Sequence, residues 1–224
     1  MESVNLKALT KTEIFARATE EEVSSMLNCL SAKKKKKYQK DEIIFHAGDI
    51  VSSIGVMLKG NALIENDDIW GNRSVLDYVK EGQIFAETYA CALDEKLMVN
   101  VIAMSDCEVL FLDVRKILKV CPNACEFHQN LVQNLLAISA QKNLNLSRRI
   151  FHTSSKTIRG RLLSYLSYQA MEREKEEFDI PYNRQQLADY LGVDRSAMSN
   201  ELGKMQKDGL IEVKRNHFRI LDVD

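Results

Sequence analysis

Hydrophobic positions recur at helical intervals at both ends of the chain and in short runs in the middle. Within residues 1 to 30 the spacing of Leu6, Leu9 and Phe15 predicts helix. From residue 37 to residue 112, short apolar or alternating runs are separated by turn residues, which indicates an all-β sandwich or barrel. The predicted strands are residues 43–45, 54–58, 62–64, 74–79, 99–103 and 109–112.

A long helix is predicted after the strands. No Gly or Pro occurs between Phe127 and Ile150, and apolar residues form a stripe along this segment. One side of so long a helix is expected to cover the β-domain, and the other to pair with a second copy of itself. Residues 156–171 read as a further amphipathic helix. The stripe consists of Phe127, Leu131, Leu135, Ile138 and Ala140, widened by Val132 and Leu136.

Two short helices joined by a tight turn are predicted near the C-terminus. Asn183 and Gln186 have the spacing of a capping box, and Asp194 can cap the second helix. Gly192 tolerates the positive φ that the turn requires. Residues 210–213 and 218–221 then read as a hairpin, so the segment is a helix-turn-helix with a wing. The inward side chains are expected to be Leu187, Ala188, Leu191, Met198, Leu202 and Met205.

Composition and net charge limit the classes of protein to which the chain can belong. The chain has 224 residues, is 45% hydrophobic and 28% charged, and carries a formal net charge of −1, so any basic surface must be local. No run of eighteen apolar residues and no signal-peptide pattern is present, so we expect a cytoplasmic protein without a membrane partner. The five cysteines are expected to be reduced thiols. The lysines at residues 33–37 are interpreted as a solvated edge before the first strand.

The whole chain resembles the Crp/Fnr family of bacterial transcription regulators. The resemblance rests on residues 42–49 (EIIFHAGD), Lys59-Gly60, residues 81–87 (EGQIFAE) and residues 185–211, in this order. It implies an α+β fold: an N-terminal double-stranded β-helix (a jelly-roll or cupin-like β-roll), a long dimerisation helix and a C-terminal winged helix-turn-helix. The corresponding domains are residues 1–112 for effector binding, 113–152 for dimerisation and 153–224 for DNA binding.

The second helix of the helix-turn-helix offers hydrogen-bonding side chains near its N-terminus, where major-groove base edges are read. Arg195 can bind guanine bidentately, Asn200 can bind adenine, and Ser196 and Ser199 can serve either way. The best-known family members carry Glu where Ser196 stands and Arg where Asn200 stands, so their half-sites are not expected here. Phosphate contacts are assigned to Arg184, Lys204, Lys214, Arg215 and His217.

The effector pocket departs from the cyclic-nucleotide pattern of the family. Cyclic-nucleotide binders use an Arg and a Ser or Thr to hold the phosphate, but no Arg occurs between Arg73 and Arg115. We therefore expect an unknown small-molecule effector other than cyclic AMP. Glu87 either binds a hydroxyl or amine of that effector or is a structural capping residue. The candidate pocket residues are Phe85, Glu87, Leu97, Met98, Leu146 and Ser147.

Cysteines and histidines suggest no certain cofactor. Only Cys29 precedes Cys91, which argues against the N-terminal iron–sulfur cluster of some family members. Cys121 and Cys125 are four residues apart and offer an alternative, a thiol-based redox or metal sensor. His46 and His128 are the candidate axial ligands for a haem, to which no pattern points. Since the four histidines are scattered and neither a Ser-His-Asp nor a Cys-His arrangement is apparent, we expect no enzyme and no metal site.

The sequence therefore predicts a dimeric, sequence-specific DNA-binding regulator, an activator by family tendency. Its DNA site is expected to be an inverted repeat in double-stranded DNA, and RNA polymerase is an expected partner. An effector or redox signal in the β-roll is expected to shift the long helix and a hinge. A regulator that binds DNA without any effector is the remaining alternative. The hinge residues are Thr153, Ser154, Ser155, Lys156 and Thr157.

Overall fold

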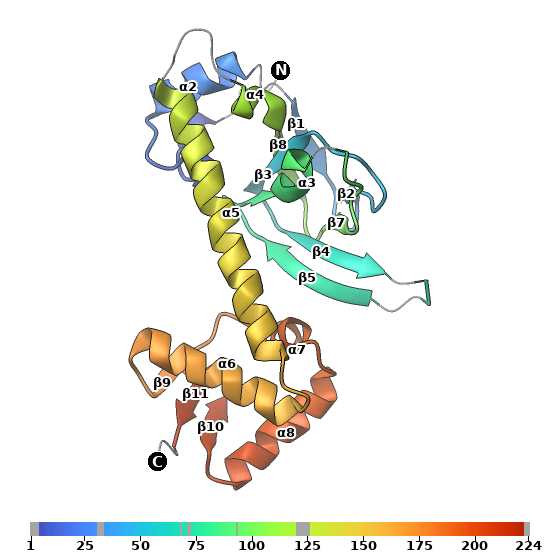
Figure 1. Cartoon of the computed structure of the whole chain (residues 1–224), viewed down its shortest axis with the longest axis vertical. Coiled ribbons are helices and arrows are strands. Elements are labelled where there is room, and N and C mark those ends of the chain that lie inside the picture. Colours follow the sequence, from blue (N-terminus) through green and yellow to red (C-terminus); the bar gives the residue numbers. More distant parts are fainter. Residues whose placement is uncertain are drawn as a thin grey trace. The chain divides into compact units, whose positions relative to one another are not determined.

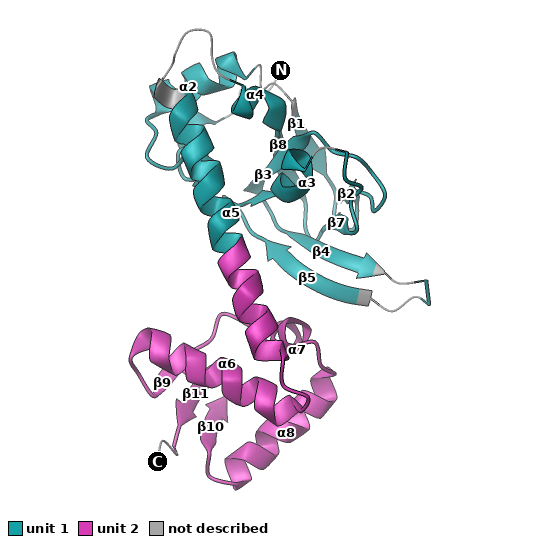
Figure 2. Cartoon of the chain, viewed as in Figure 1, with its two compact units in different colours: residues 1–142 teal, residues 143–224 magenta. Residues whose placement is uncertain are grey.

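The structure, a computed structural model, describes residues 5–30, 34–67, 69–70, 73–92, 94–119 and 126–221. It consists of two compact units, residues 1–142 and residues 143–224 (Figure 2). The long helix α5, Glu126–Thr153, runs through the boundary between them. Each unit has its own hydrophobic core, so the elements that position a site are described unit by unit.

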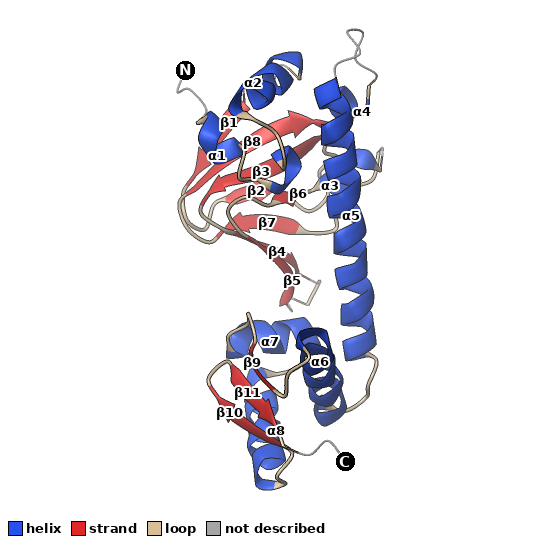
Figure 3. Cartoon of the chain, turned by 90° about the vertical axis from the view of Figure 1, so that its left-hand side faces the viewer, coloured by secondary structure: helices blue, strands red, loops and turns tan. Residues whose placement is uncertain are grey.

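The first unit contains two four-stranded antiparallel sheets (Figures 1 and 3). One has the order β1-β8-β3-β6, the other β2-β7-β4-β5. The predicted strands are present, and the β-roll is confirmed. The strands are β1 (Lys34–Tyr38), β2 (Ile43–Phe45), β3 (Ser53–Lys59), β4 (Ala62–Asp67), β5 (Arg73–Val79), β6 (Ile84–Phe85), β7 (Asn100–Ala103) and β8 (Cys107–Asp113).

The sequence pattern missed β1 and β6. The lysine run was expected to be a solvated edge before the first strand, but residues 34–38 are themselves a strand, paired with β8 at the end of its sheet. Lys35 and Lys37 form ion pairs with Glu108 on β8, at 3.0 and 3.6 Å between Nζ and the carboxylate. These pairs reduce the repulsion between neighbouring lysines, which makes a strand of like charges tolerable.

Short helices cover the first unit and share its core. Thr19 and Glu22 form a capping box at the start of α2. On α5, Leu131 and Leu135 are buried in the same core, whereas Val132 and Leu136 remain exposed. The predicted packing of one helix side against the β-domain is therefore confirmed. The helices and helical turns are α1 (Leu6–Leu9), η1 (Glu13–Phe15), α2 (Glu20–Cys29), α3 (Glu87–Cys91) and α4 (Val114–Leu118).

The second unit packs three helices on a three-stranded sheet of order β10-β11-β9. Strand β9 was not expected, because its residues end the acidic run at 172–179. Phe178 is buried while Glu177 and Asp179 are exposed, so the strand alternates across two faces. The elements are α6 (Ile158–Arg173), β9 (Glu177–Asp179), α7 (Arg184–Leu191), α8 (Arg195–Lys207), β10 (Ile211–Lys214) and β11 (His217–Ile220).

Candidate functional site

The turn between α7 and α8 is built from local hydrogen bonds that the sequence predicted. The Asn183 Oδ1 accepts from the Gln186 amide, and the Gln186 Oε1 accepts from the Asn183 amide, both at 2.9 Å. Gly192 ends α7 with φ 62°, and the Asp194 Oδ1 accepts from the Ala197 amide at 2.7 Å. Ala188 is fully buried, which allows the helices to approach closely. The helix-turn-helix is thus confirmed, and its six predicted inward side chains are buried.

The outer face of α8 carries the predicted base-reading side chains. Arg195, Ser196, Ser199 and Asn200 are all exposed. The Ser199 hydroxyl donates to the carbonyl of Arg195 at 2.9 Å, so its proton is used within the helix. At a base edge Ser199 therefore offers acceptor capacity, whereas Arg195 and Asn200 offer the bidentate groups that discriminate bases.

The predicted phosphate contacts have unequal surroundings. Lys214 and Arg215 are exposed at the β10–β11 turn, the tip of the wing, where Arg215 has φ 58°. Arg184 is held with its guanidinium carbon 5.4 Å from the centre of the Phe218 ring, and burial lowers its pKa. The Lys204 ammonium lies 3.6 Å from a Glu201 oxygen, so a carboxylate of the same helix partly neutralises its charge.

His217 lies between two carboxylates on the neighbouring strand. Its Nδ1 is 3.0 Å from Asp179 Oδ1 and its Nε2 is 2.9 Å from Glu177 Oε1. Hydrogen bonds to Asp179 and then to Glu177 raise the pKa of His217. With both ring nitrogens engaged inside the sheet, the geometry does not support His217 as a phosphate contact. Its place between two carboxylates arises from the unpredicted strand β9.

Two arginines that carry no signal in the sequence bind the end of α7. Arg149, near the end of α5, donates from Nε to the carbonyl of Tyr190 at 2.8 Å and from a terminal nitrogen to that of Asp189 at 2.7 Å. Arg161, on α6, donates to the carbonyls of Leu191 and Gly192 at 2.8 and 3.0 Å. The last carbonyls of a helix lack intrahelical partners and carry partial negative charge. Both guanidinium groups therefore stabilise the turn that positions α8.

The predicted hinge residues form a hydrogen-bonded link between α5 and α6. Helix α5 ends at Thr153, and Thr157 caps α6 by accepting from the Gly160 amide at 3.0 Å. The carbonyl of Ser155 accepts from Arg161 Nε at 2.9 Å. A Cβ at Gly160 would lie 2.1 Å from Ser155 Oγ, so only glycine fits there without displacing the link.

An aromatic cluster lies against the last turn of α5. His152 is 1% exposed, its ring centre lies 5.6 Å from that of Tyr165, and its Nδ1 is 3.2 Å from Ser164 Oγ. Burial and then the charge of Arg148 lower the pKa of His152. Burial also raises the pKa of Tyr190 to about 12. The cluster therefore favours a neutral imidazole at the end of α5.

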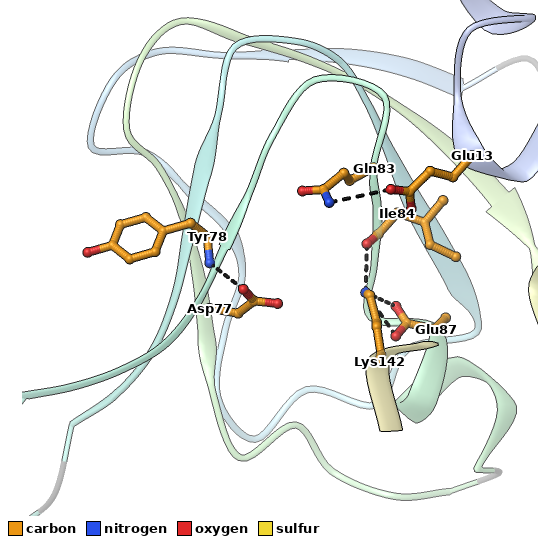
Figure 4. A network of polar contacts seen from close by, with 7 residues as sticks. All are labelled: Glu13, Asp77, Tyr78, Gln83, Ile84, Glu87 and Lys142. Atoms are coloured by element: carbon orange, nitrogen blue, oxygen red, sulfur yellow. Dashed lines mark hydrogen bonds and ion pairs between the residues drawn. The ribbon is translucent and has the colours of Figure 1, made fainter. Parts of the chain in front are cut away.

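Glu87, the central residue of the expected effector pocket, is held by a lysine from α5 (Figure 4). The Glu87 residue is 4% exposed, and each of its carboxylate oxygens lies 3.0 Å from the Lys142 ammonium. Lys142 also donates to the carbonyl of Ile84 at 2.8 Å. Ala86 precedes α3 with φ 62°, the backbone turn that directs Glu87 inward. Lys142 was missed because 55 positions separate it from Glu87.

The other expected pocket residues are not all buried. Phe85 and Leu97 are buried in the first unit, and the Phe85 ring lies so close to Gly55 that a Cβ there would be 2.2 Å from it. Met98 is 68% exposed. Leu146 and Ser147 are also exposed and belong to the unit formed by residues 143–224.

The remaining predictions concern metals, thiols and membranes. Cys121 and Cys125 lie outside the described residues, so the thiol-sensor alternative that rests on them stays a prediction. Across the described ranges, no three His, Cys, Asp or Glu side chains are grouped so that they could hold a metal ion. Within the same part of the chain, no helix combines the length and apolar character that a membrane span needs.

Comparison with known proteins identifies the family. The model described as "Cyclic nucleotide-binding domain" matches residues 35–123, and that described as "Crp-like helix-turn-helix domain" matches residues 160–224. The chain is 21% identical over 179 residues to the cAMP-activated global transcriptional regulator CRP of Haemophilus influenzae, covering 78% of each chain. It is 24% identical over 203 residues to Electron transport regulator A of Shewanella oneidensis, covering 84% of this chain and 75% of that protein.

Solved structures agree on the fold. The structure titled "OCPA complexed CprK" matches with a TM-score of 0.69 at 12% identity, covering 88% of this chain and 91% of that chain. The chain belongs to the Crp/Fnr family of transcription regulators, with an effector-binding-type β-domain and a DNA-binding helix-turn-helix. Neither matched family model describes an enzyme.

Proposed function

We propose that the chain is a homodimeric regulator that binds an inverted-repeat DNA site through α8 and activates transcription together with RNA polymerase. The observation that carries the DNA contact is the outer face of α8, where Arg195 and Asn200 are exposed above a buried core. Donors and acceptors at the start of such a helix read base edges in the major groove. Lys214 and Arg215 at the tip of the wing, with Arg184 and Lys204, supply phosphate contacts.

Exposed apolar residues of α5 support the dimer. Leu136 is 70% exposed and Leu144 is 53% exposed, although Leu131 and Leu135 of the same helix are buried. Leu136 and Leu144 lie two helical turns apart, with Val132 one turn before Leu136, on one side of the helix. A second copy of α5 is the partner that buries this side of both helices, and two recognition helices then face successive major grooves about 34 Å apart.

The state of Glu87 supports an effector other than cyclic AMP. A cyclic nucleotide needs a cation for its phosphate, and the cation next to Glu87, Lys142, is already bound to that carboxylate. A ligand in this pocket therefore has to displace Lys142 or avoid Glu87. We infer that the signal changes the contact that Lys142 makes between α5 and the β-domain. The resulting movement of α5 is then transmitted to the recognition helix through the link at Thr153–Thr157.

Selection of random duplex DNA by the purified protein, without effector and at two salt concentrations, tests the proposal. An enriched inverted repeat supports base reading by a dimer that needs no added effector. Enrichment only with an added ligand supports effector control, and cyclic AMP in one arm must give none. If the protein binds no duplex at either salt concentration, the proposed DNA contact is wrong.

Two substitutions separate base reading from phosphate contact. Arg195→Ala is expected to relax one guanine position at a cost of about 1–3 kcal/mol, because it removes a bidentate contact. Lys214→Ala is expected to weaken binding to all sequences alike and to reduce the salt slope by about 1. Lys207→Ala, at the far end of α8, is the matched control and leaves the selected sequence unchanged. An unaltered guanine preference in Arg195→Ala would assign base reading to other residues.

A further inference from the structure

A thiol and an imidazole meet where α2 ends and α5 begins. Cys29, the last residue of α2, is exposed, and its Sγ lies 3.6 Å from the Nδ1 of His128. His128 is 8% exposed and lies in the first turn of α5, 99 positions along the chain. This pairing of a cysteine with a histidine is not apparent from the sequence, because sequence spacing does not show that α2 and α5 meet.

The hydrogen bond that Nε2 of His128 makes determines which atom is the donor in the contact between Nδ1 and the Cys29 thiol. His128 Nε2 lies 2.7 Å from the carbonyl oxygen of Lys116 on α4. A carbonyl oxygen only accepts, so Nε2 carries a proton. In the neutral ring Nδ1 is then the acceptor, and the Cys29 thiol is its donor. Transfer of that proton gives a thiolate beside an imidazolium, with the ring held in place by Lys116. This is the arrangement of nucleophile, base and orienting group that activates cysteines.

We propose that Cys29 is a modification site at which hydroperoxides oxidise the thiol to a sulfenic acid, with His128 as its proton partner. The Cys29 thiolate attacks one peroxide oxygen, an S–O bond forms and the O–O bond breaks. Sulfur loses two electrons and the peroxide gains them. The leaving group, an alkoxide or, from hydrogen peroxide, hydroxide, takes the proton from the His128 imidazolium and becomes an alcohol or water. The oxidised sulfur would then lie at the contact between α2 and α5.

Two other cysteines lack this arrangement and serve as internal references. Cys91 is exposed like Cys29, but burial and then the nearby Glu87 carboxylate raise the pKa of its thiol. Cys107 is buried, and its Sγ donates to the carbonyls of Asn61 and Ser105 at 3.2 and 3.1 Å. Because the thiolate is the reactive form, both are expected to react more slowly than Cys29.

Peptide-resolved labelling of the whole protein tests the proposal. The reduced protein receives limiting hydrogen peroxide in the presence of dimedone, which traps sulfenic acids, and the adduct on each cysteine peptide is quantified by mass spectrometry. Cys29 is expected to be labelled well before Cys91. His128→Gln is expected to slow the labelling of Cys29 by about tenfold or more, because it removes the proton partner. His46→Gln is the matched control and leaves the Cys29 rate unchanged.

A pH profile separates proton transfer from a packing effect. The rate at which iodoacetamide alkylates Cys29 in the unaltered protein is expected to rise at a lower pH than that of Cys91. This comparison needs no variant, so it decides the matter even if His128→Gln fails to fold. Equal profiles, or a Cys29 rate that His128→Gln does not alter, would overturn the pairing. Fast alkylation of Cys29 without a dimedone adduct would overturn the assignment of hydroperoxide as its reactant.

Discussion

The caps of the helix-turn-helix and the Glu87–Lys142 ion pair are assembled in opposite ways. In the turn, Asn183 and Asp194 bond to amides three residues further along the chain. Glu87, in contrast, is paired with Lys142, 55 positions away and on another helix. The caps of the turn are therefore local, whereas the Glu87–Lys142 pair exists only when α5 packs against the β-domain. The two regions should accordingly respond differently to substitution.

The largest expected effect is a loss of stability in the unit that contains the turn. Leu202 of α8 is 2% exposed in the core of the second unit. Leu202→Ala is expected to lower the free energy of unfolding by about 2–5 kcal/mol, since it removes buried methyl groups and leaves a cavity. Thermal unfolding of the variant, compared with the exposed control Gln206→Ala, measures the loss. A change below about 1 kcal/mol would contradict the close packing of α8.

The second effect tests the Glu87–Lys142 ion pair. Lys142→Met leaves the Glu87 carboxylate buried without its ammonium partner, and is expected to cost about 2 kcal/mol. Glu87→Gln combined with Lys142→Met is expected to recover part of that loss, because no uncompensated charge remains. Chemical unfolding of the two single variants and the double variant gives the coupling energy. Additive losses would show that the ion pair does not couple α5 to the β-domain.

A smaller effect is expected at the cap of α7. Asn183→Ala removes the side chain that accepts from the Gln186 amide and is expected to cost about 1 kcal/mol. Asn183→Asp keeps an acceptor at the same place and is the matched control, with little expected loss. Helix content and unfolding midpoint follow both variants. Equal losses in the two would mean that the cap does not stabilise α7.

The smallest effect depends on pH and lies in the β9–β11 pairing. Asp179 and Glu177 raise the pKa of His217 above its ordinary value of about 6.5. The stabilisation is therefore fully present below the ordinary pKa and is lost as the pH rises through the raised one. The difference in unfolding temperature between the wild type and His217→Gln is expected to shrink from about pH 6 to about pH 9. A difference that grows over this range would contradict the pairing.

Sequence reasoning predicted the parts that depend on neighbours along the chain. Gly192 and Asp194 mark their turn by residue type and spacing alone, and the alternating runs of the β-domain mark most strands. Strand β1 was missed because five residues of like charge resemble a solvated loop until Glu108 is seen beside them. The pairings of Lys142 with Glu87 and of His128 with Cys29 were missed because these residues become neighbours only when α5 is in place.

The two arginines at the end of α7 restrict where the chain can bend. Rotation about the link at residues 154–156 would move Arg149 and Arg161 relative to each other, yet both hold the carbonyls of residues 189–192. Of these four hydrogen bonds, the two from Arg149 cross from α5 to α7, and both would have to break before the link moved alone. The last turn of α5 and the helix-turn-helix are therefore expected to move together. The bending that transmits a signal is then expected earlier in α5, on the N-terminal side of Arg149.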